Sequence, residues 1–321
     1  LNDNWRPSAG IDALRLRARL LASAREYFRS RGVLEVETPL AVSRTVSDPQ
    51  IESLQLAGDP RYLHTSPEYA MKRLLAAGSG DIFQVCKVFR AGERSALHNP
   101  EFTMIEWYRA GMDLAGIMAE TAGLAAQLLA DGWPHAGGQV EYLDYQAAFR
   151  RELQVDPLAA PIEALASLCV THGLAKGSTA GASRDQLLDF LVATQIGPRL
   201  GRHCLTCLHH YPASQAALAR LDADDPRTAL RFELYAAGVE LANGYVELAD
   251  AGEQARRFAL DQQLRQARGQ ARIEADERLL AALQAGLPPC AGVALGFDRV
   301  AMLAAGATRI DAVLAFPWER V

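Results

Sequence analysis

The sequence predicts an α+β fold in which an antiparallel sheet is flanked by helices. Two hairpins indicate the sheet. In the first, strand-like runs at 81–89 and 101–108 are joined by a polar loop; in the second, two runs within 231–248 meet at a turn. Apolar residues at helical spacing over 11–31, and an alanine- and leucine-rich stretch at 114–201, indicate the helices.

Composition limits the classes of protein that the chain can represent. No Pro/Gly-rich linker divides the 321 residues, so we expect one domain, 1–321, with a helical insertion around 114–201. The net charge is −5 and there is no Lys/Arg-rich tract, which does not favour binding along a nucleic-acid backbone. No apolar run reaches the ~20 residues of a membrane span. Five scattered cysteines, an odd number, favour a reducing cytoplasm.

The first element is an amphipathic helix at 11–31, which Gly32 can end, followed by a short strand at 33–36 that stops before Pro39. A helix, a strand and a proline in this order are compatible with a dimer interface and equally with an ordinary packed helix. The next helix, 69–77, is preceded by Ser66-Pro67, a pair typical of an N-cap and first helical position.

The loop of the first hairpin carries residues suited to a ligand. Arg90 stands at the end of the first strand, and guanidinium groups pair bidentately with phosphate oxygens. On the returning strand Phe102, Glu106 and Tyr108 share one face because side chains alternate with period two. An aromatic ring, a carboxylate and a phenol beside an arginine indicate a site for a nucleotide and a small cationic substrate.

The second hairpin carries three carboxylates, Glu233, Glu240 and Glu247. They are compatible with a solvated strand face, and equally with Mg²⁺ held against nucleotide phosphates by hard oxygen ligands. Further along, Gly292 to Arg299 reads GVALGFDR. Glycines in a strand allow close approach of a ligand or of another backbone, and the arginine at the strand-to-helix junction can point at a phosphate.

Cys204 and Cys207 form a Cys-x-x-Cys pair near three histidines. A four-ligand zinc site usually shows a second ligand pair at comparable spacing, and none follows. The segment 204–211 also alternates like a strand, so we expect a strand rather than a zinc site.

In this order the segments resemble the class II aminoacyl-tRNA synthetase catalytic domain. The first motif is the helix at 11–31 with its strand, the second is FRAGERSALHNPEFT, and the third is GVALGFDR. The flanking TSPEYAMKRLL, HNPEFTMIEWYR and ELANGYVEL are similar to the lysyl-tRNA synthetase branch. The resemblance covers almost the whole chain and implies the class II fold.

Three departures from lysyl-tRNA synthetases refine this resemblance. Only about ten residues precede the first motif helix, so we expect no OB-fold anticodon domain, and Ala294 stands where that branch has glycine. Both features, with YPASQAALA and PPCAGVALG, resemble the elongation factor P–(R)-β-lysine ligase family. In the loop, Arg90-Ala91-Gly92-Glu93 lacks the adenine-reading acid at 92, so backbone groups of Ala91 and Gly92, or a shifted Glu93, must replace it.

The resemblance also implies roles for individual residues. The catalytic set would be Arg90, Glu240 and Arg299, with Mg²⁺ held by Glu233 and Glu240. ATP would contact Arg90, Ala91, Gly92, His98, Asn99, Phe102, Glu240, Leu241, Gly296 and Arg299. The amino-acid substrate would lie among Ser66, Pro67, Glu68, Glu106, Tyr108, Asn243, Glu247 and Ala294.

The activity implied is ATP-dependent formation of a (R)-β-lysyl adenylate and transfer of the β-lysyl group to a lysine side chain of elongation factor P. A homodimer is expected, and neither tRNA nor a membrane is expected as a partner. Two alternatives remain open. One is a truncated lysyl-tRNA synthetase-like enzyme acting on α-lysine and tRNA or another amine; the other is a non-catalytic synthetase-like regulator.

Overall fold

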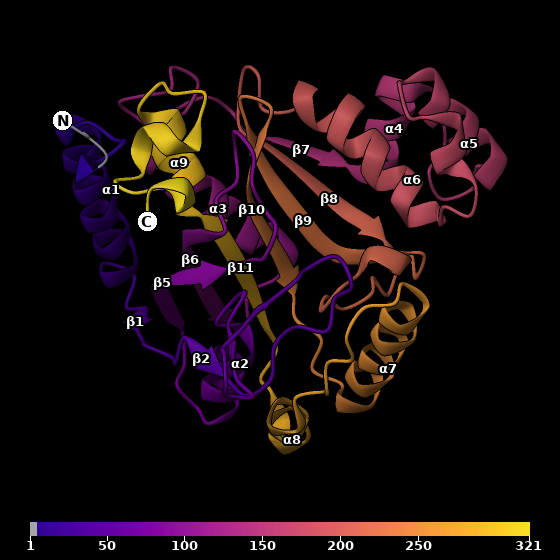
Figure 1. Ribbon diagram of the computed structural model, residues 1–321, viewed down its shortest axis with the longest axis horizontal. Coiled ribbons are helices and arrows are strands. Elements are labelled where there is room, and N and C mark those ends of the chain that lie inside the picture. The colour runs from indigo at the N-terminus through magenta and orange to yellow at the C-terminus, as the bar shows by residue number, and fades with distance from the viewer. Residues whose placement is uncertain (1–4) are drawn as a thin grey trace.

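The computed structural model describes residues 5–321 and is built on an eight-stranded sheet (Figure 1). The strand order is β1-β5-β6-β11-β10-β9-β8-β7. The outer pairs β1/β5 and β7/β8 are parallel, and all other neighbours are antiparallel. The strands are β1 (Leu34–Glu35), β5 (Ile82–Phe89), β6 (Glu101–Ala110), β7 (Glu141–Asp144), β8 (Thr206–Pro212), β9 (Thr228–Ala236), β10 (Val239–Val246) and β11 (Cys290–Gly296).

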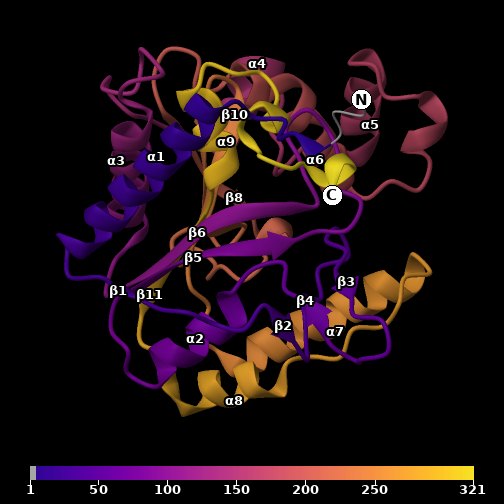
Figure 2. The ribbon, with the colours of Figure 1, turned by 60° about the vertical axis from the view of Figure 1, so that its left-hand side comes forward.

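A second, small sheet has the order β2-β4-β3 and precedes the first hairpin. Its strands are β2 (Ala41–Val42), β3 (Leu54–Gln55) and β4 (Tyr62–Leu63). Figures 1 and 2 show β2 close to α2, and the loop between β2 and β3 reaches α7, since Ser47 donates to Asp261 at 2.5 Å. The helices are α1 (Ile11–Arg29), α2 (Glu68–Ala76), α3 (Leu114–Leu129), α4 (Tyr145–Leu153), α5 (Ile162–Thr171), α6 (Arg184–Leu191), α7 (Ala251–Ala267), α8 (Glu277–Gly286) and α9 (Phe297–Ala304).

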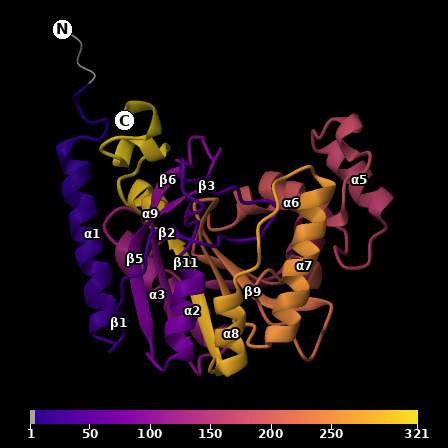
Figure 3. The same cartoon turned by 60° about the horizontal axis from the view of Figure 1, so that its bottom comes forward.

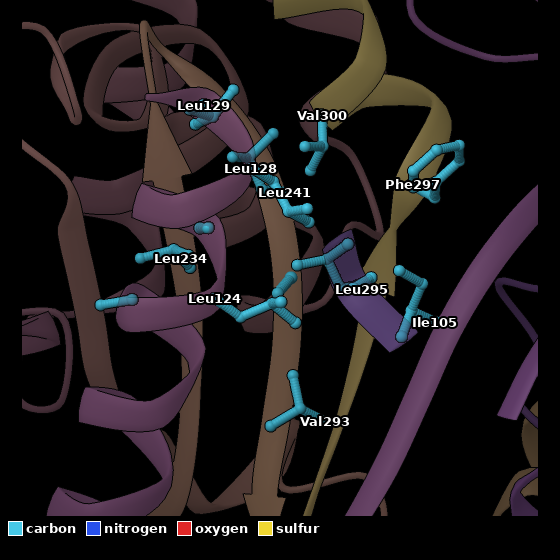
Figure 4. Packing of buried hydrophobic residues seen from close by; sticks show 14 of the residues in the cluster. Ile105, Leu124, Leu128, Leu129, Leu234, Leu241, Val293, Leu295, Phe297 and Val300 are labelled. Carbon is cyan, nitrogen blue, oxygen red and sulfur yellow. The ribbon is translucent and has the colours of Figure 1, made fainter. Parts of the chain in front are cut away.

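The two faces of β6 pack against different helices because neighbouring side chains alternate across a strand. Ile105 and Trp107 belong to a core formed with α1, α3 and α9, part of which is drawn in Figure 4. Tyr108 belongs instead to a cluster with Met71 of α2 and Leu279 of α8. The sheet is therefore covered on one side by α1, α3 and α9, while the side that carries Glu106 and Tyr108 faces α2 and α8.

The first predicted helix is confirmed, since α1 ends at Arg29 and Gly32 adopts φ +71° in the following turn. Its buried residues Leu20, Ala24, Tyr27 and Phe28 form the apolar stripe, and Phe28 stacks on the ring of Phe83 with 4.5 Å between centroids. Burial of this stripe anchors α1 on the sheet. The predicted strand at 33–36 is shorter than expected and comprises only Leu34–Glu35.

The stretch 114–201 is mainly helical and also contains one short strand that the sequence analysis did not include. It contains β7, which pairs in parallel with β8, and its first helix, α3, packs in the central core. The four residues of β7 form too short a run to show an alternating pattern against the surrounding helical spacing. Helices α4, α5 and α6 form a separate cluster beside β7, at the end of the sheet away from α1 (Figure 3).

The strand predicted at 204–211 is confirmed as β8, which begins at Thr206. Cys207 is buried within it, and both Cys204 and Cys207 are free thiols. Across the described part of the chain no helix is long and apolar enough to cross a membrane.

Candidate active site

The loop between β5 and β6 places Arg90 against the ring of Phe102. The guanidinium carbon lies 5.2 Å from the ring centroid, and Nη1 lies 3.6 Å from a carboxylate oxygen of Glu93. The buried Nε has no hydrogen-bond partner within residues 5–321. Gly92 adopts φ +78°, a conformation that side chains rarely allow, and this turn directs Glu93 back toward Arg90. Arg90 therefore retains donor capacity for a ligand next to an aromatic ring.

Arg299, at the start of α9, reaches across to the same loop. Its Nη2 lies 2.6 Å from Nε2 of His98, and its Nη1 donates to the carbonyl of Glu240 at 2.8 Å. Because a guanidinium can only donate, Nε2 of His98 accepts and the ring proton lies on Nδ1, 2.7 Å from the Ser95 hydroxyl. Burial, followed by the Arg299 charge, lowers the pKa of His98. The imidazole is therefore neutral and holds Arg299 in place.

Asn99 lies in this loop but supports it from within. Its amide nitrogen donates to the carbonyl of Glu101 at 2.6 Å, and its oxygen accepts from the backbone N–H of Trp318 at 2.9 Å. A nucleotide contact through this side chain stays a prediction, because both ends of the amide are already bonded within the protein.

Glu233 and Glu240, the predicted metal ligands, lie on neighbouring strands. Glu233 is 8% exposed, accepts from Arg231 and Tyr235 at 2.7 Å each, and lines the same cavity as Glu240. Burial, together with the nearby Glu233 charge, raises the pKa of Glu240. Two carboxylates on neighbouring strands that line one cavity form a donor set that fits a hard divalent cation.

These residues line a cavity of about 280 Å³ between the sheet and the helical insertion. Asp189 of α6 and Val192, which follows it, lie on the opposite wall from the strands, so the insertion contributes directly to the site. The titratable lining residues named so far, with Asp189 and Arg231, are His98, Glu233, Glu240 and Arg299.

A second group of polar side chains lies along β6 and α2. The carboxylate of Glu106 accepts from the hydroxyls of Ser66 at 2.8 Å and Tyr108 at 2.7 Å. Glu106 is 2% exposed, and burial, with the Glu68 charge, raises its pKa to about 8. Ser66 also accepts from the backbone N–H of Glu68 at 3.0 Å, but the N-cap residue of α2 is Pro67 and not the predicted Ser66.

Lys72 completes this group, and the sequence analysis missed it. Its ammonium lies 2.7 Å from Glu68 and 2.6 Å from Glu247, and the residue is 1% exposed. Burial alone would lower the pKa of Lys72, but the two carboxylates raise it above its usual value. Burial also raises the pKa of Glu247 to about 7, with Lys72 opposing that rise. The four-residue spacing of Glu68 and Lys72 was the sequence signal that could have predicted an ion pair on one face of α2.

Strand β11 forms the floor of this group, where small residues are required. Ala294 pairs in register with Glu106, and Gly292 pairs with Tyr108. A Cβ at Gly292 would lie 2.4 Å from the ring of Tyr108 and 2.5 Å from a carboxylate oxygen of Glu247, so only glycine fits there. By contrast, a Cβ at Gly296 would make only ordinary contacts at 3.7 Å or more, which leaves room for a ligand above the strand.

Asn243 supplies a further polar atom. Its nitrogen donates to the Tyr245 hydroxyl at 3.1 Å, while its buried Oδ1 has no hydrogen-bond partner in the described part of the chain. A buried acceptor without a partner is costly, so a donor on a bound ligand would relieve it. Leu241, in the same strand β10, is buried at 2% exposure.

The three sequence motifs meet at Asp298, which was not a candidate. Its carboxylate is 1% exposed and lies 2.6 Å from Arg17 of α1, and it accepts from the backbone N–H of Thr103 of β6 at 2.9 Å. Asp298 thereby fixes the start of α9, which carries Arg299, against α1 and the first hairpin. Asp298 and Thr103 are 195 residues apart in the sequence, so a pattern read over a few neighbouring residues cannot predict their contact.

The antiparallel sheet, the arginines from two distant segments and the carboxylate group define a class II aminoacyl-tRNA synthetase catalytic fold. The family model for class II tRNA synthetases of the D, K and N type matches residues 4–320. The chain is 47% identical to the elongation factor P–(R)-β-lysine ligase of Pseudoalteromonas translucida (strain TAC 125), over 98% of each chain. Relatives with the same name from Histophilus somni (strain 2336) and Salmonella dublin are 46% and 45% identical, again over 98% of each chain.

The chain therefore belongs to the class II tRNA synthetase family and, within it, to the group of elongation factor P–(R)-β-lysine ligases. It is an ATP-dependent ligase, which confirms the fold class and the enzyme class predicted from the sequence.

Proposed function

We propose that this protein activates (R)-β-lysine with ATP and transfers the β-lysyl group to a lysine side chain of elongation factor P. The charge of the buried pocket carries the proposal. Glu68, Glu106 and Glu247 supply three carboxylates and Lys72 one ammonium, which leaves two negative charges when all are ionised. A lysine-type substrate brings two ammonium groups. Burial of unpaired charge is costly, so this balance favours a substrate whose two ammonium groups enter the pocket.

In the first half-reaction the substrate carboxylate attacks the α-phosphorus of ATP, and the bond to pyrophosphate breaks. Arg90, with its unpartnered Nε, holds the α-phosphate and the carboxylate in line, and Phe102 stacks on the adenine. Arg299, oriented by His98, holds the γ-phosphate. When bound at Glu233 and Glu240, Mg²⁺ neutralises charge on the phosphates.

In the second half-reaction the neutral amine of the acceptor lysine attacks the carbonyl carbon of the adenylate. An amide bond forms, AMP leaves with the bonding electron pair, and the amine loses a proton. No protein nucleophile is required, because catalysis rests on positioning and charge stabilisation.

The assembly that we propose is a homodimer in the cytoplasm, with no tRNA as acceptor. The edge strand β1 and the start of α1 support a dimer surface, since Leu34 is 55% exposed and Ile11 is 58% exposed. Five free cysteines support a reducing compartment. Sedimentation of the purified protein tests the dimer, and a monomer at micromolar concentration would contradict it.

The acceptor assay tests the function as a whole. Incubation with ATP and labelled (R)-β-lysine should place label on elongation factor P, and ATP–pyrophosphate exchange should prefer (R)-β-lysine over α-lysine. Label on tRNA with α-lysine would favour the truncated synthetase instead. No exchange with either amino acid, from a folded protein, would favour a non-catalytic regulator.

A further inference from the structure

Two adjacent histidines at the far end of the sheet have no role in the proposed reaction. His209 and His210 end the regular part of β8, and Asp144 ends β7 beside them. One ligand atom from each of the three side chains lies within 4.8 Å of the others. All three residues are half-buried, so the cluster is shielded but reachable from solvent.

The backbone turns the two imidazoles toward each other. The pairing register of β8 with β9 shifts between His209 and Tyr211, and His210 in the bulge adopts φ +59°. As a result the Nδ1 atoms of the two rings lie 2.5 Å apart, which is shorter than the usual range for an N–H donor. With Zn–N bonds of ~2.0–2.1 Å a tetrahedral ion holds two nitrogens ~3.3 Å apart, so a small turn of either ring would let both Nδ1 atoms reach one cation.

The remaining contacts favour the ligand form of His210 and leave one oxygen of Asp144 for a cation. Nε2 of His210 lies 3.3 Å from the carboxylate of Asp222, which favours a proton on Nε2 and leaves Nδ1 unprotonated. Asp144 accepts from the backbone N–H of Ala147 through Oδ1, and its second oxygen can serve a cation.

This cluster is separate from the candidate active site. His209 pairs with Phe232 of β9, whereas Leu208 pairs with Glu233, one of the predicted Mg²⁺ ligands. Because neighbouring residues alternate across a strand, His209 and Glu233 point to opposite faces of the sheet. A ligand at the histidines is therefore distinct from the nucleotide and its metal.

We propose that Asp144, His209 and His210 bind one divalent transition-metal ion of the Zn²⁺ class. Two imidazoles and a carboxylate are borderline ligands that suit Zn²⁺ and its neighbours in the first row, rather than the all-oxygen sites of Mg²⁺. A water completes the tetrahedron. The ion joins β7 to β8 at the point where the chain leaves the sheet for α4, and so fastens the helical insertion to the catalytic sheet.

Metal titration of the whole protein, without an affinity tag and after treatment with a chelator, tests the site. Binding of Zn²⁺ is measured by competition with a chromophoric chelator, and Co²⁺ by its visible ligand-field bands. The variants are His209→Gln and His210→Asn, since asparagine tolerates the left-handed conformation of position 210. His203→Gln is the matched control, because His203 is an exposed histidine near Cys204 and outside the cluster.

The wild-type protein and His203→Gln should bind about one Zn²⁺ per chain, and each cluster variant should weaken binding at least ~10-fold. Metal should also raise the melting temperature of the wild-type protein and of the control only. Equal Zn²⁺ affinity in the wild type and both cluster variants overturns the proposal, as does loss of binding in His203→Gln. If a cluster variant does not fold, Asp222→Asn should still weaken Zn²⁺ binding ~10- to 100-fold. An unchanged Zn²⁺ affinity in Asp222→Asn would also overturn the proposal.

Discussion

Binding of a lysine-type substrate should release protons from the buried carboxylates. The pKa of Glu106 is about 8 and that of Glu247 about 7 in the free protein. At pH 7 a group with a pKa of about 8 is ~90% protonated and one with a pKa of about 7 is ~50% protonated. An ammonium placed beside them favours the charged forms and lowers both pKa values, so most of these protons must leave.

The sign and size of the effect follow from linkage. Cation binding favours the deprotonated carboxylates, so affinity should rise with pH through the window from 6 to 8. The substrate amines, with pKa values near ~10, stay charged over that range. Release of roughly one proton at pH 7 corresponds to a ~10-fold gain in affinity per pH unit, levelling off above pH 8.

Isothermal titration calorimetry with (R)-β-lysine measures this directly. The apparent enthalpy in buffers of different ionisation enthalpy gives the number of protons released. Glu106→Gln should remove most of the release and weaken binding by ~2–3 kcal/mol, because it removes a buried charge partner. Glu101→Gln is the control, since Glu101 lies on the same strand with its side chain 42% exposed and only a 3.6 Å pair to Lys87.

No dependence of the enthalpy on buffer at pH 7, together with affinity that is constant from pH 6 to 8, would refute this reasoning. Such a result would mean that the carboxylates are already ionised in the free protein, and that Lys72 and bound water neutralise the pocket.

Three further predictions concern single residues. Lys72→Met leaves Glu68 and Glu247 buried without a cation and should destabilise the protein by ~3–5 kcal/mol in urea unfolding; Lys87→Met, at an exposed pair, should cost less than ~1 kcal/mol. Ala294→Gly removes a methyl opposite Glu106 and should shift the ratio of kcat/KM for α- over β-lysine upward by ~10- to 200-fold, a prediction refuted by an unchanged ratio. Asp298→Asn should lower stability by ~2–4 kcal/mol and raise KM for ATP, whereas a variant with wild-type KM and stability would show that the contacts to α1 and β6 are dispensable.

Local patterns in the sequence were sufficient to predict much of the fold. The alternation of β5 and β6 placed Phe102, Glu106 and Tyr108 on one face, and the Ser66-Pro67 pair marked the start of α2. Period and capping depend only on residues a few positions apart, so the sequence states them directly. The short strand β7 was missed because four residues within a helical stretch show no period.

The candidate site likewise has a part that the sequence predicted and a part that only the structure revealed. By itself the sequence determined the class of fold, the motif residues and the excess of carboxylates that calls for a cationic substrate. Only the tertiary structure decided that Lys72 takes two of those carboxylates and that His98 orients Arg299 across 201 residues of chain. It also decided that the Asn99 side chain donates to the carbonyl of Glu101 and accepts from the N–H of Trp318. The physical reason is that a strand's period sets which face a side chain occupies, whereas its partner there depends on strand register and helix packing between segments far apart in the sequence.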